Sequence, residues 1–256
     1  MPAASCPPSP ACAACTRVTT GNARKSRGEP RLPWRIERRA LIRIRLTHTK
    51  TGALRYTGNL DMQKVWERAF RRARLPLAYS QGFHPQPRIN QACPLPLGFT
   101  SQVELLDVWL EEDLPLDQVR AAVTAAIPAG ITILDIQPVD LRAPALQTQV
   151  DTSDYTVTLH QGVASSDLKS KVAGVLLAPS LPRERRGKTY DLRPLIVDLR
   201  VVRLDDGTIQ LHMCLTVREG ATGRPEEVML ALGLDPFAAS VARSGLSLKT
   251  QLPAEA

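Results

Sequence analysis

The chain is poor in aromatic residues and has no long apolar run. Only 4% of its 256 residues are Phe, Trp or Tyr, whereas 21 are Pro, so short elements separated by rigid turns are expected rather than one helical bundle. No segment approaches the roughly 18 consecutive apolar residues that a membrane helix needs. With 43% hydrophobic and 23% charged residues, the sequence predicts a soluble globular protein that does not act in a membrane.

Cysteine is also scarce, and its distribution is not that of a secreted protein. Three of the five cysteines, Cys6, Cys12 and Cys15, lie in the first 15 residues, and the odd number and irregular spacing argue against a disulfide framework. The N-terminus has no charged start followed by an apolar stretch, so no signal peptide is expected and a cytoplasmic location is favoured. Since the Cys12–Cys15 pair has no fourth ligand nearby, we expect no metal and no cofactor.

Common catalytic motifs are missing as well. The chain contains no G-x-S-x-G, no glycine-rich phosphate loop ending in Lys-Ser or Lys-Thr, no H-E-x-x-H and no dinucleotide fingerprint. Asp61 and His84 are the candidates that remain for a catalytic group. Asp61 lies at the start of an expected helix, where a carboxylate also has a purely structural interpretation. A non-enzymatic role is therefore favoured, and catalysis stays open.

Positive charge is concentrated near the N-terminus. Residues 1–100 hold 18 Lys and Arg against 4 Asp and Glu, residues 101–150 hold 2 against 8, and residues 151–256 hold 13 against 13. Because phosphates attract Arg and Lys at long range, RNA is the leading partner class and an acidic protein surface is the second.

Periodicity predicts the same order of elements in each half of the chain. Residues 40–49 alternate as a half-buried strand, and residues 59–75 form the clearest amphipathic helix, with Asn59 as its expected N-cap. The first half continues with strands at 87–93, 103–112 and 131–139 and a helix at 115–127. The second half has strands at 154–160 and 242–249, helices at 165–178 and 224–234, and a hairpin across residues 205–207.

This order, strand, helix, strand, strand, helix, strand, is that of the ferredoxin-like unit. The sequence therefore predicts an α+β fold of two tandem ferredoxin-like (βαββαβ) modules with antiparallel sheets. The first covers residues 37–142, the second residues 151–250, and they are joined near residues 141–153. Residues 1–36 lack periodicity and are expected to form a disordered basic leader.

Two segments of the first module are candidates for binding RNA. The helix at 59–75 has a cationic face opposite its apolar stripe, which includes Trp66, and further arginines lie close in sequence. The connector Tyr79–Arg88 combines aromatic rings, an imidazole and a guanidinium, which suits base stacking and phosphate contacts. The predicted RNA-binding residues are Arg43, Arg45, Arg55, Lys64, Arg68, Arg71, Arg72, Tyr79, Phe83, His84 and Arg88. A solvated helix face and a rigid structural loop are the alternatives. The cluster at residues 183–188 is expected to be a loop that could extend this surface.

The run Leu54–Gly98, with the strings Tyr-Ser-Gln-Gly-Phe-His-Pro and Pro-Leu-Pro-Leu-Gly, resembles a radical-SAM-associated domain family of unknown function. That domain occurs fused after a radical SAM enzyme or as a separate protein. The resemblance implies a radical SAM partner supplied in trans and work near RNA, either tRNA or rRNA, or the ribosome. It suggests an accessory protein that presents RNA to this partner. An RNA-modifying enzyme and a protein adaptor without RNA are the alternatives. The chain has Gln86 and Asn59 where relatives tend to have His, so a site that needs several histidines is not expected.

Overall fold

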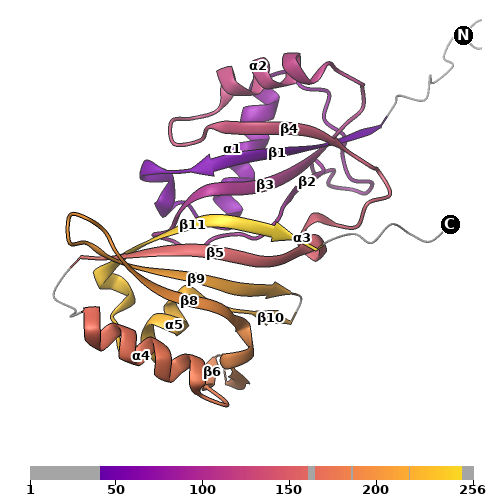
Figure 1. Cartoon of the computed structure of the whole chain (residues 1–256). Coiled ribbons are helices and arrows are strands. Elements are labelled where there is room, and N and C mark those ends of the chain that lie inside the picture. The colour runs from indigo at the N-terminus through magenta and orange to yellow at the C-terminus, as the bar shows by residue number, and fades with distance from the viewer. Residues whose placement is uncertain (1–40, 161–164, 186, 219, 250–256) are drawn as a thin grey trace, which may run out of the picture. The chain divides into compact units, whose positions relative to one another are not determined.

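A computed structural model describes residues 41–160, 165–185, 187–218 and 220–249 (Figure 1). The described residues form one compact unit. Its N-terminal half contains β1 (Ile42–Lys50), α1 (Asn59–Arg72), β2 (Ile89–Gln91), β3 (Thr100–Leu110), α2 (Leu116–Ala126) and β4 (Ile133–Val139). The short helix α3 (Leu146–Gln149) leads to the C-terminal half. That half contains β5 (Val150–Leu159), α4 (Ser165–Leu177), β6 (Pro182–Arg185), β7 (Lys188–Asp191), β8 (Ile196–Arg203), β9 (Ile209–Arg218), β10 (Ala221–Thr222), α5 (Pro225–Ala231) and β11 (Ala239–Leu248).

The two halves have strands arranged in the same order. In the N-terminal half the order is β4-β1-β3-β2, with every neighbouring pair antiparallel. In the C-terminal half the equivalent order, read in the same direction, is β11-β5-β9-β8, and these pairs are again antiparallel. The short strand β10 pairs with the end of β9, beyond the residues that pair with β8. The mixed α+β class and the mainly antiparallel sheet that the sequence predicts are confirmed.

Each half packs its helices on an apolar core, and Leu95 and Phe99 of the N-terminal half also join the core of the C-terminal half. In the N-terminal half, Trp66 and Phe70 of α1 and Val123 of α2 pack on Leu46 and Leu106 of the sheet. The core of the C-terminal half joins α4 and α5 to β5, β8 and β9. Trp66 is fully buried, as its place on the apolar stripe of α1 predicts.

The halves meet in one sheet rather than in two separate ones. Near Thr100 and Ser101, β3 pairs in parallel with Ala242 and Arg243 of β11, and this pairing makes the nine-stranded sheet continuous (Figure 1). The strand β2 pairs only with residues 106–108 of β3, so it leaves the start of β3 open to β11. The sequence leaves open whether the modules dock through their sheets or their helices, because it contains no signal for contacts between strands so far apart.

A buried ionic network reinforces this junction. The side chain of Arg243 is fully buried and donates to Glu104 Oε1 at 2.7 Å, the Cys93 carbonyl at 2.7 Å and Ser153 Oγ at 2.9 Å. Burial raises the pKa of Glu104, which Arg243 opposes, and burial lowers the pKa of Lys50 beside them. Arg243 therefore links β11 to both β3 and β5 through charge-assisted bonds.

Local boundaries differ from the predicted ones for identifiable reasons. Gly58, not Asn59, occupies the N-cap position of α1. The helix ends at Arg72, because Arg74 has a φ of 56° and Pro76 follows, and neither residue continues a helix. The cluster at residues 183–188 is not a simple loop, since residues 183–185 lie on β6 and Lys188 lies on β7. The predicted leader and its three cysteines lie outside the described residues.

Among the described residues, no helix has the length and apolar character needed to cross a membrane.

Candidate nucleic-acid interface

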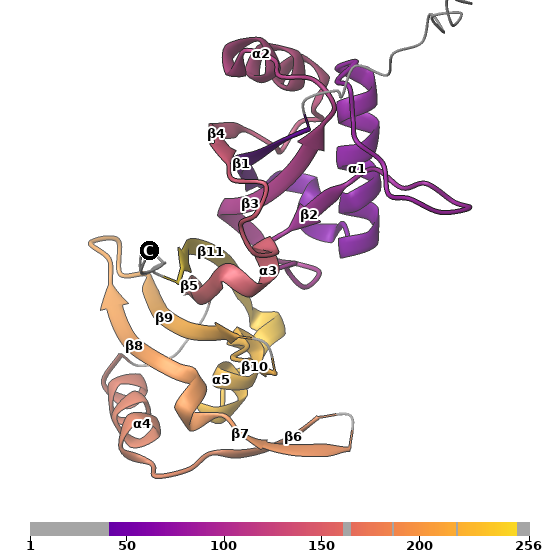
Figure 2. The same ribbon diagram turned by 90° about the vertical axis from the view of Figure 1, so that its right-hand side faces the viewer.

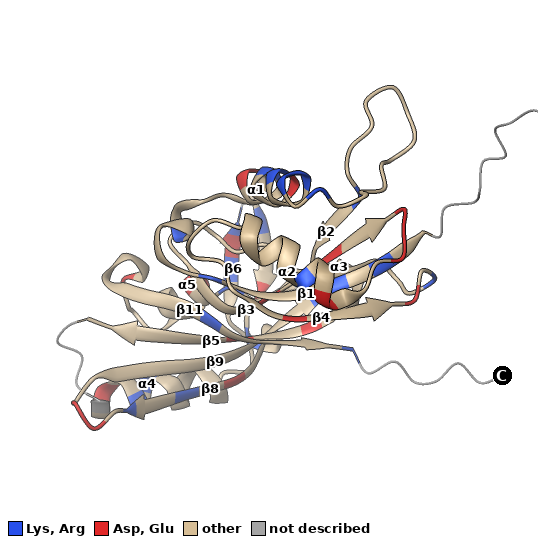
Figure 3. Cartoon of the chain, turned by 90° about the horizontal axis from the view of Figure 1, so that it is seen from above, with Lys and Arg blue, Asp and Glu red and all other residues tan. Residues whose placement is uncertain are grey.

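The outer face of α1 carries the basic residues that the sequence predicts. The apolar stripe of α1 fixes the rotation of the helix, because Met62, Trp66, Ala69 and Phe70 are all buried against the sheet. The opposite face is therefore left to solvent. Figure 3 shows Lys and Arg along the outward side of α1 and at the segment that follows it. The exposed basic residues are Lys64, Arg68, Arg71, Arg72 and Arg74.

These basic groups are neutralised to different degrees. Arg71 forms an ion pair of 2.7 Å with Glu67 one turn earlier. Arg72 Nη1 donates to the Ala126 carbonyl at the end of α2, at 2.8 Å. Lys64 and Arg68 have no ion pair or hydrogen bond with any residue in the described part of the chain. Arg72 and Arg74 also keep their positive charge, but on α1 itself only the side chains of Lys64 and Arg68 are free of any bond to a described residue.

The connector after α1 is a hairpin-shaped loop. The Ser80 amide donates to the Gln86 carbonyl and the Arg88 amide to the Ala78 carbonyl, both at 2.8 Å. Gly82, near the tip, has a φ of 136°, a conformation that L side chains rarely adopt. The ring of Phe83 is fully exposed at 102%, whereas Tyr79, at the base, is 37% exposed. The loop thus holds a large apolar ring in water, where a partner could cover it.

The base of this loop borders a cavity on the sheet face away from α1 and α2. The cavity has a volume of about 380 Å³, and its lining includes Ser80, Gln86, Arg88, Asn90 and Trp109. The guanidinium of Arg88 stacks on the Trp109 ring at 4.7 Å, and that of Arg43 contacts the same ring at 4.8 Å. Trp109 is itself buried under these guanidinium groups, so the cavity offers mainly Arg88 and polar side chains, which suit a phosphate or the edge of a base.

Trp109 and Asn90 line this cavity, although neither is among the residues predicted from the sequence. Both lie on strands, where the pattern shows only alternation. The available signal was the apolar Trp109 within the run Val103–Glu112, but its relation to Arg43 depends on the pairing of β1 with β3. Sequence spacing alone does not reveal that register.

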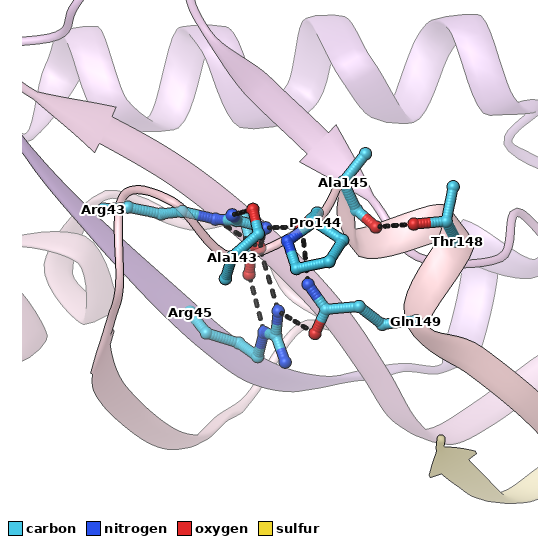
Figure 4. A network of polar contacts seen from close by, with 8 residues as sticks. Arg43, Arg45, Ala143, Pro144, Ala145, Thr148 and Gln149 are labelled. Atoms are coloured by element: carbon cyan, nitrogen blue, oxygen red, sulfur yellow. Dashed lines mark hydrogen bonds and ion pairs between the residues drawn. The ribbon is translucent and has the colours of Figure 1, made fainter. Parts of the chain in front are cut away.

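Arg43 and Arg45 do not belong to an exposed surface, which corrects their assignment as RNA ligands. They are 2% and 5% exposed, and both bind Asp107, which is fully buried. Nε of Arg43 donates to Asp107 Oδ2 at 2.9 Å, and Nε of Arg45 donates to Oδ1 at 2.7 Å. The segment at residues 143–149 covers this pair of arginines (Figure 4). Both guanidinium groups are therefore committed to Asp107 inside the protein, and Arg43 contributes to the cavity over Trp109 only as part of its buried lining.

The remaining predicted residues fall into two groups. Arg55 is half-buried, with its Nε bonded to the Gly98 carbonyl at 3.1 Å and its guanidinium over the Tyr56 ring. Asp61 and His84 are exposed, and neither lines the cavity over Trp109. Neither Asp61 nor His84 has an ion pair or a side-chain hydrogen bond with another described residue. They therefore form no recognisable catalytic arrangement.

Comparison with known proteins identifies a family but no activity. The model of a family of uncharacterized proteins conserved in bacteria (DUF2344) matches residues 43–225. No curated protein matches the chain.

Similar solved structures include a chain in a crystal structure of a Cbf5-Nop10-Gar1 complex. It has 9% identity and a TM-score of 0.43, over 78% of this chain and 48% of that chain. A chain of the archaeal box H/ACA sRNP Nop10-Cbf5 complex has 10% identity and a TM-score of 0.37, over 77% and 46%. The small subunit of acetolactate synthase from Thermotoga maritima has 11% identity and a TM-score of 0.25, over 83% and 98%. The chain spans about half the length of the first two. Likenesses this distant carry no argument about function.

Proposed function

The chain belongs to the bacterial family DUF2344, and we propose that it is an accessory protein that binds single-stranded RNA. The observation that supports this best is that cations and an exposed aromatic ring follow one another along residues 64–88. The free cations Lys64 and Arg68 are followed by the exposed ring of Phe83 and by Arg88 over the Trp109 cavity. Cations that follow a backbone and rings that stack on bases are the two parts of sequence-tolerant RNA binding.

Each part of this segment has a separate task. Lys64 and Arg68 attract phosphates and release counterions, which gives affinity without sequence preference. Phe83 and Tyr79 offer rings to unstacked bases, and Arg88 and His84 lie beside them as partners for phosphates or base edges. The cavity over Trp109 is large enough to receive one group of the RNA, with Asn90 and Gln86 as hydrogen-bonding side chains.

The finer assignment follows from the family resemblance and the topology. We infer that the RNA, either tRNA or rRNA, is presented to a radical SAM enzyme supplied in trans in the cytoplasm. We also infer that residues 37–142 and 151–250 are two ferredoxin-like modules, because each half has the strand order of that unit. The contact between β3 and β11 then fuses the two modules into one rigid support.

Binding of a short fluorescein-labelled single-stranded RNA, measured across a range of salt concentrations, tests the proposal. The double variant Lys64→Gln/Arg68→Gln should lower the slope of log affinity against log salt by about 1.4, or about 0.7 for each phosphate that the protein no longer neutralises. The matched control is Arg200→Gln/Arg203→Gln on β8, which removes two exposed charges from the other half and should leave the slope unchanged.

Two results would contradict the proposal. One is an affinity that does not depend on salt, and the other is an equal slope for the double variant and the wild type. If RNA does not bind but the radical SAM partner co-elutes with the protein at low salt, the basic face serves a protein adaptor instead. Co-expression followed by size-exclusion chromatography distinguishes this outcome.

A further inference from the structure

The C-terminal half contains a second basic cavity that the proposed RNA surface does not use. It has a volume of about 420 Å³ and lies between the β6–β7 hairpin and the turn that follows β9. Its lining includes Arg185, Lys188, Tyr190, Thr222 and Arg224. Three cations and a phenol therefore surround one concave space.

Strand register explains why these side chains converge. In the hairpin, Arg183 pairs directly with Tyr190, and Arg185 pairs directly with Lys188. Residues two apart on a strand share a face, and directly paired residues share it too, so all four side chains lie on one side of the hairpin. Glu184 belongs to the opposite face. The alternation thus separates the acid from the cations.

The positive charge in this cavity is not neutralised by described residues. Arg185, Lys188 and Arg224 have no ion pair or hydrogen bond within the described part of the chain, and the buried Nε of Arg183 has no partner there either. Asp191 is the acid that lines the cavity, and its Oδ1 accepts from the amides of Leu181 and Arg193 at 2.7 and 2.9 Å. These bonds lower the pKa of Asp191, so it remains a carboxylate.

Two glutamates, Glu226 and Glu227, lie in the first turn of α5, directly after Arg224, and Glu227 acts on Tyr190. Together with Asp191 they make three acids, which the four cations outnumber. Burial, and then Glu227, raise the pKa of Tyr190, while Arg185, Arg224 and Arg183 oppose the shift. The phenol therefore keeps its proton and is available as a donor near neutral pH.

We propose that this cavity, formed by Arg185, Lys188, Tyr190 and Arg224, binds a phosphate monoester. A phosphate dianion would satisfy several guanidinium and ammonium donors at once, and arginine forks match its geometry. The volume lies in the range of small-molecule sites and leaves room for a sugar attached to the phosphate. The site goes beyond the proposed RNA surface, because it shares no residue with α1 or its loop.

Titration with inorganic phosphate, in a chloride buffer of matched ionic strength, tests this site by calorimetry and by the thermal midpoint. The wild type should bind phosphate saturably. Arg224→Gln and Arg185→Gln should each weaken binding about tenfold, the effect of losing one charge-assisted hydrogen bond. The control is Arg203→Gln, an exposed arginine at the opposite end of the β8–β9 hairpin, which should bind phosphate as the wild type does.

Several outcomes decide the matter. The absence of saturable binding, or equal affinities for the wild type and both variants, overturns the site. Thermal midpoints without phosphate show that the variants are folded.

A dinucleotide with a 5′-phosphate that binds more tightly than its 5′-hydroxyl form identifies an RNA end as the source of the phosphate. Equal binding of inorganic phosphate and the phosphorylated dinucleotide identifies a small free phosphate and also supports the site. Lys64→Gln/Arg68→Gln should leave phosphate binding intact, so failure of this site and failure of the RNA surface are separable.

Discussion

The two halves have the same strand order but place different chemistry at equivalent positions. In each half the connection from the first helix to the second core strand is long and projects from the body (Figure 2). In the N-terminal half this connection is the loop that exposes Phe83 and positions Arg88. In the C-terminal half it is the β6–β7 hairpin, which places Arg185 and Lys188 over a cavity. The fold determines where the connection emerges, whereas its side chains determine what it can bind.

Arginines within the N-terminal half also differ in what they can bind, depending on where they lie. Arg43 and Arg45 on β1 share an ion pair with Asp107, whereas Arg68 on α1 faces solvent without a partner in the described residues. All three look alike in a charge count. The buried carboxylate of Asp107 gives Arg43 and Arg45 a structural role. Arg68 has no such carboxylate beside it among the described residues and can therefore bind an external anion.

Asp107→Asn should have the largest effect and tests whether the sheet arginines are structural. Asparagine leaves two buried guanidinium groups without a counter-charge, so the free energy of unfolding should fall by about 3–5 kcal/mol. Denaturant unfolding measures it. Asp198→Asn, which breaks the exposed pair with Arg200, is the control and should cost less than about 1 kcal/mol. Equal losses in both variants would show that the buried network adds no stability.

The buried imidazole of His48 should make stability depend on pH in the N-terminal half. Burial against Trp66 lowers the pKa of His48 from 6.5 to about 3. As the pH falls below 6.5, the unfolded chain gains a proton at His48 that the folded chain does not, so stability is lost. Between pH 6.5 and about pH 5 the expected loss is about 1.6 kcal/mol.

The measurement is denaturant unfolding of the wild type and of His48→Phe across this pH range. The variant should lose less stability than the wild type over the same interval. His160→Gln, which removes an exposed imidazole in the C-terminal half, should follow the wild-type curve. Parallel curves for the wild type and His48→Phe would refute the assignment of the pH dependence to His48.

Local patterns predict the elements well, because they depend on residues close in sequence. The amphipathic stripe of Met62, Trp66 and Phe70 defines α1, and alternation defines most long strands. The partners across strands were not predictable in this way. Asp107 lies more than 60 residues from Arg43 and Arg45, and Arg243 lies 139 residues from Glu104. The sequence therefore locates the cationic helix and the exposed loop but cannot show which arginines are neutralised.

Phe83→Ala tests the difference between the two long connections. Loss of one stacking ring should weaken binding of the single-stranded RNA about tenfold, since base stacking contributes about 1–3 kcal/mol. Fluorescence anisotropy measures the affinity, and the thermal midpoint should not change because the ring is exposed. Phe237→Ala is the matched control, since this ring in the C-terminal half is 97% exposed. An equal effect of both variants would mean that any exposed ring suffices and that the loop has no special role.

Glu67→Gln should have the smallest effect and asks whether neutralisation limits the basic face of α1. Glutamine removes the carboxylate that pairs with Arg71, so one more guanidinium becomes free beside Arg68. Since the pair is exposed, stability should fall by only about 0.3–0.5 kcal/mol. The RNA affinity should rise about twofold at low salt and return to the wild-type value at high salt, where charges on the surface are screened. Glu112→Gln, an exposed acid after β3, removes the same net charge away from α1 and controls for long-range attraction. If both variants raise the affinity equally, the total charge of the protein governs binding, and Arg71 has no specific contact with RNA.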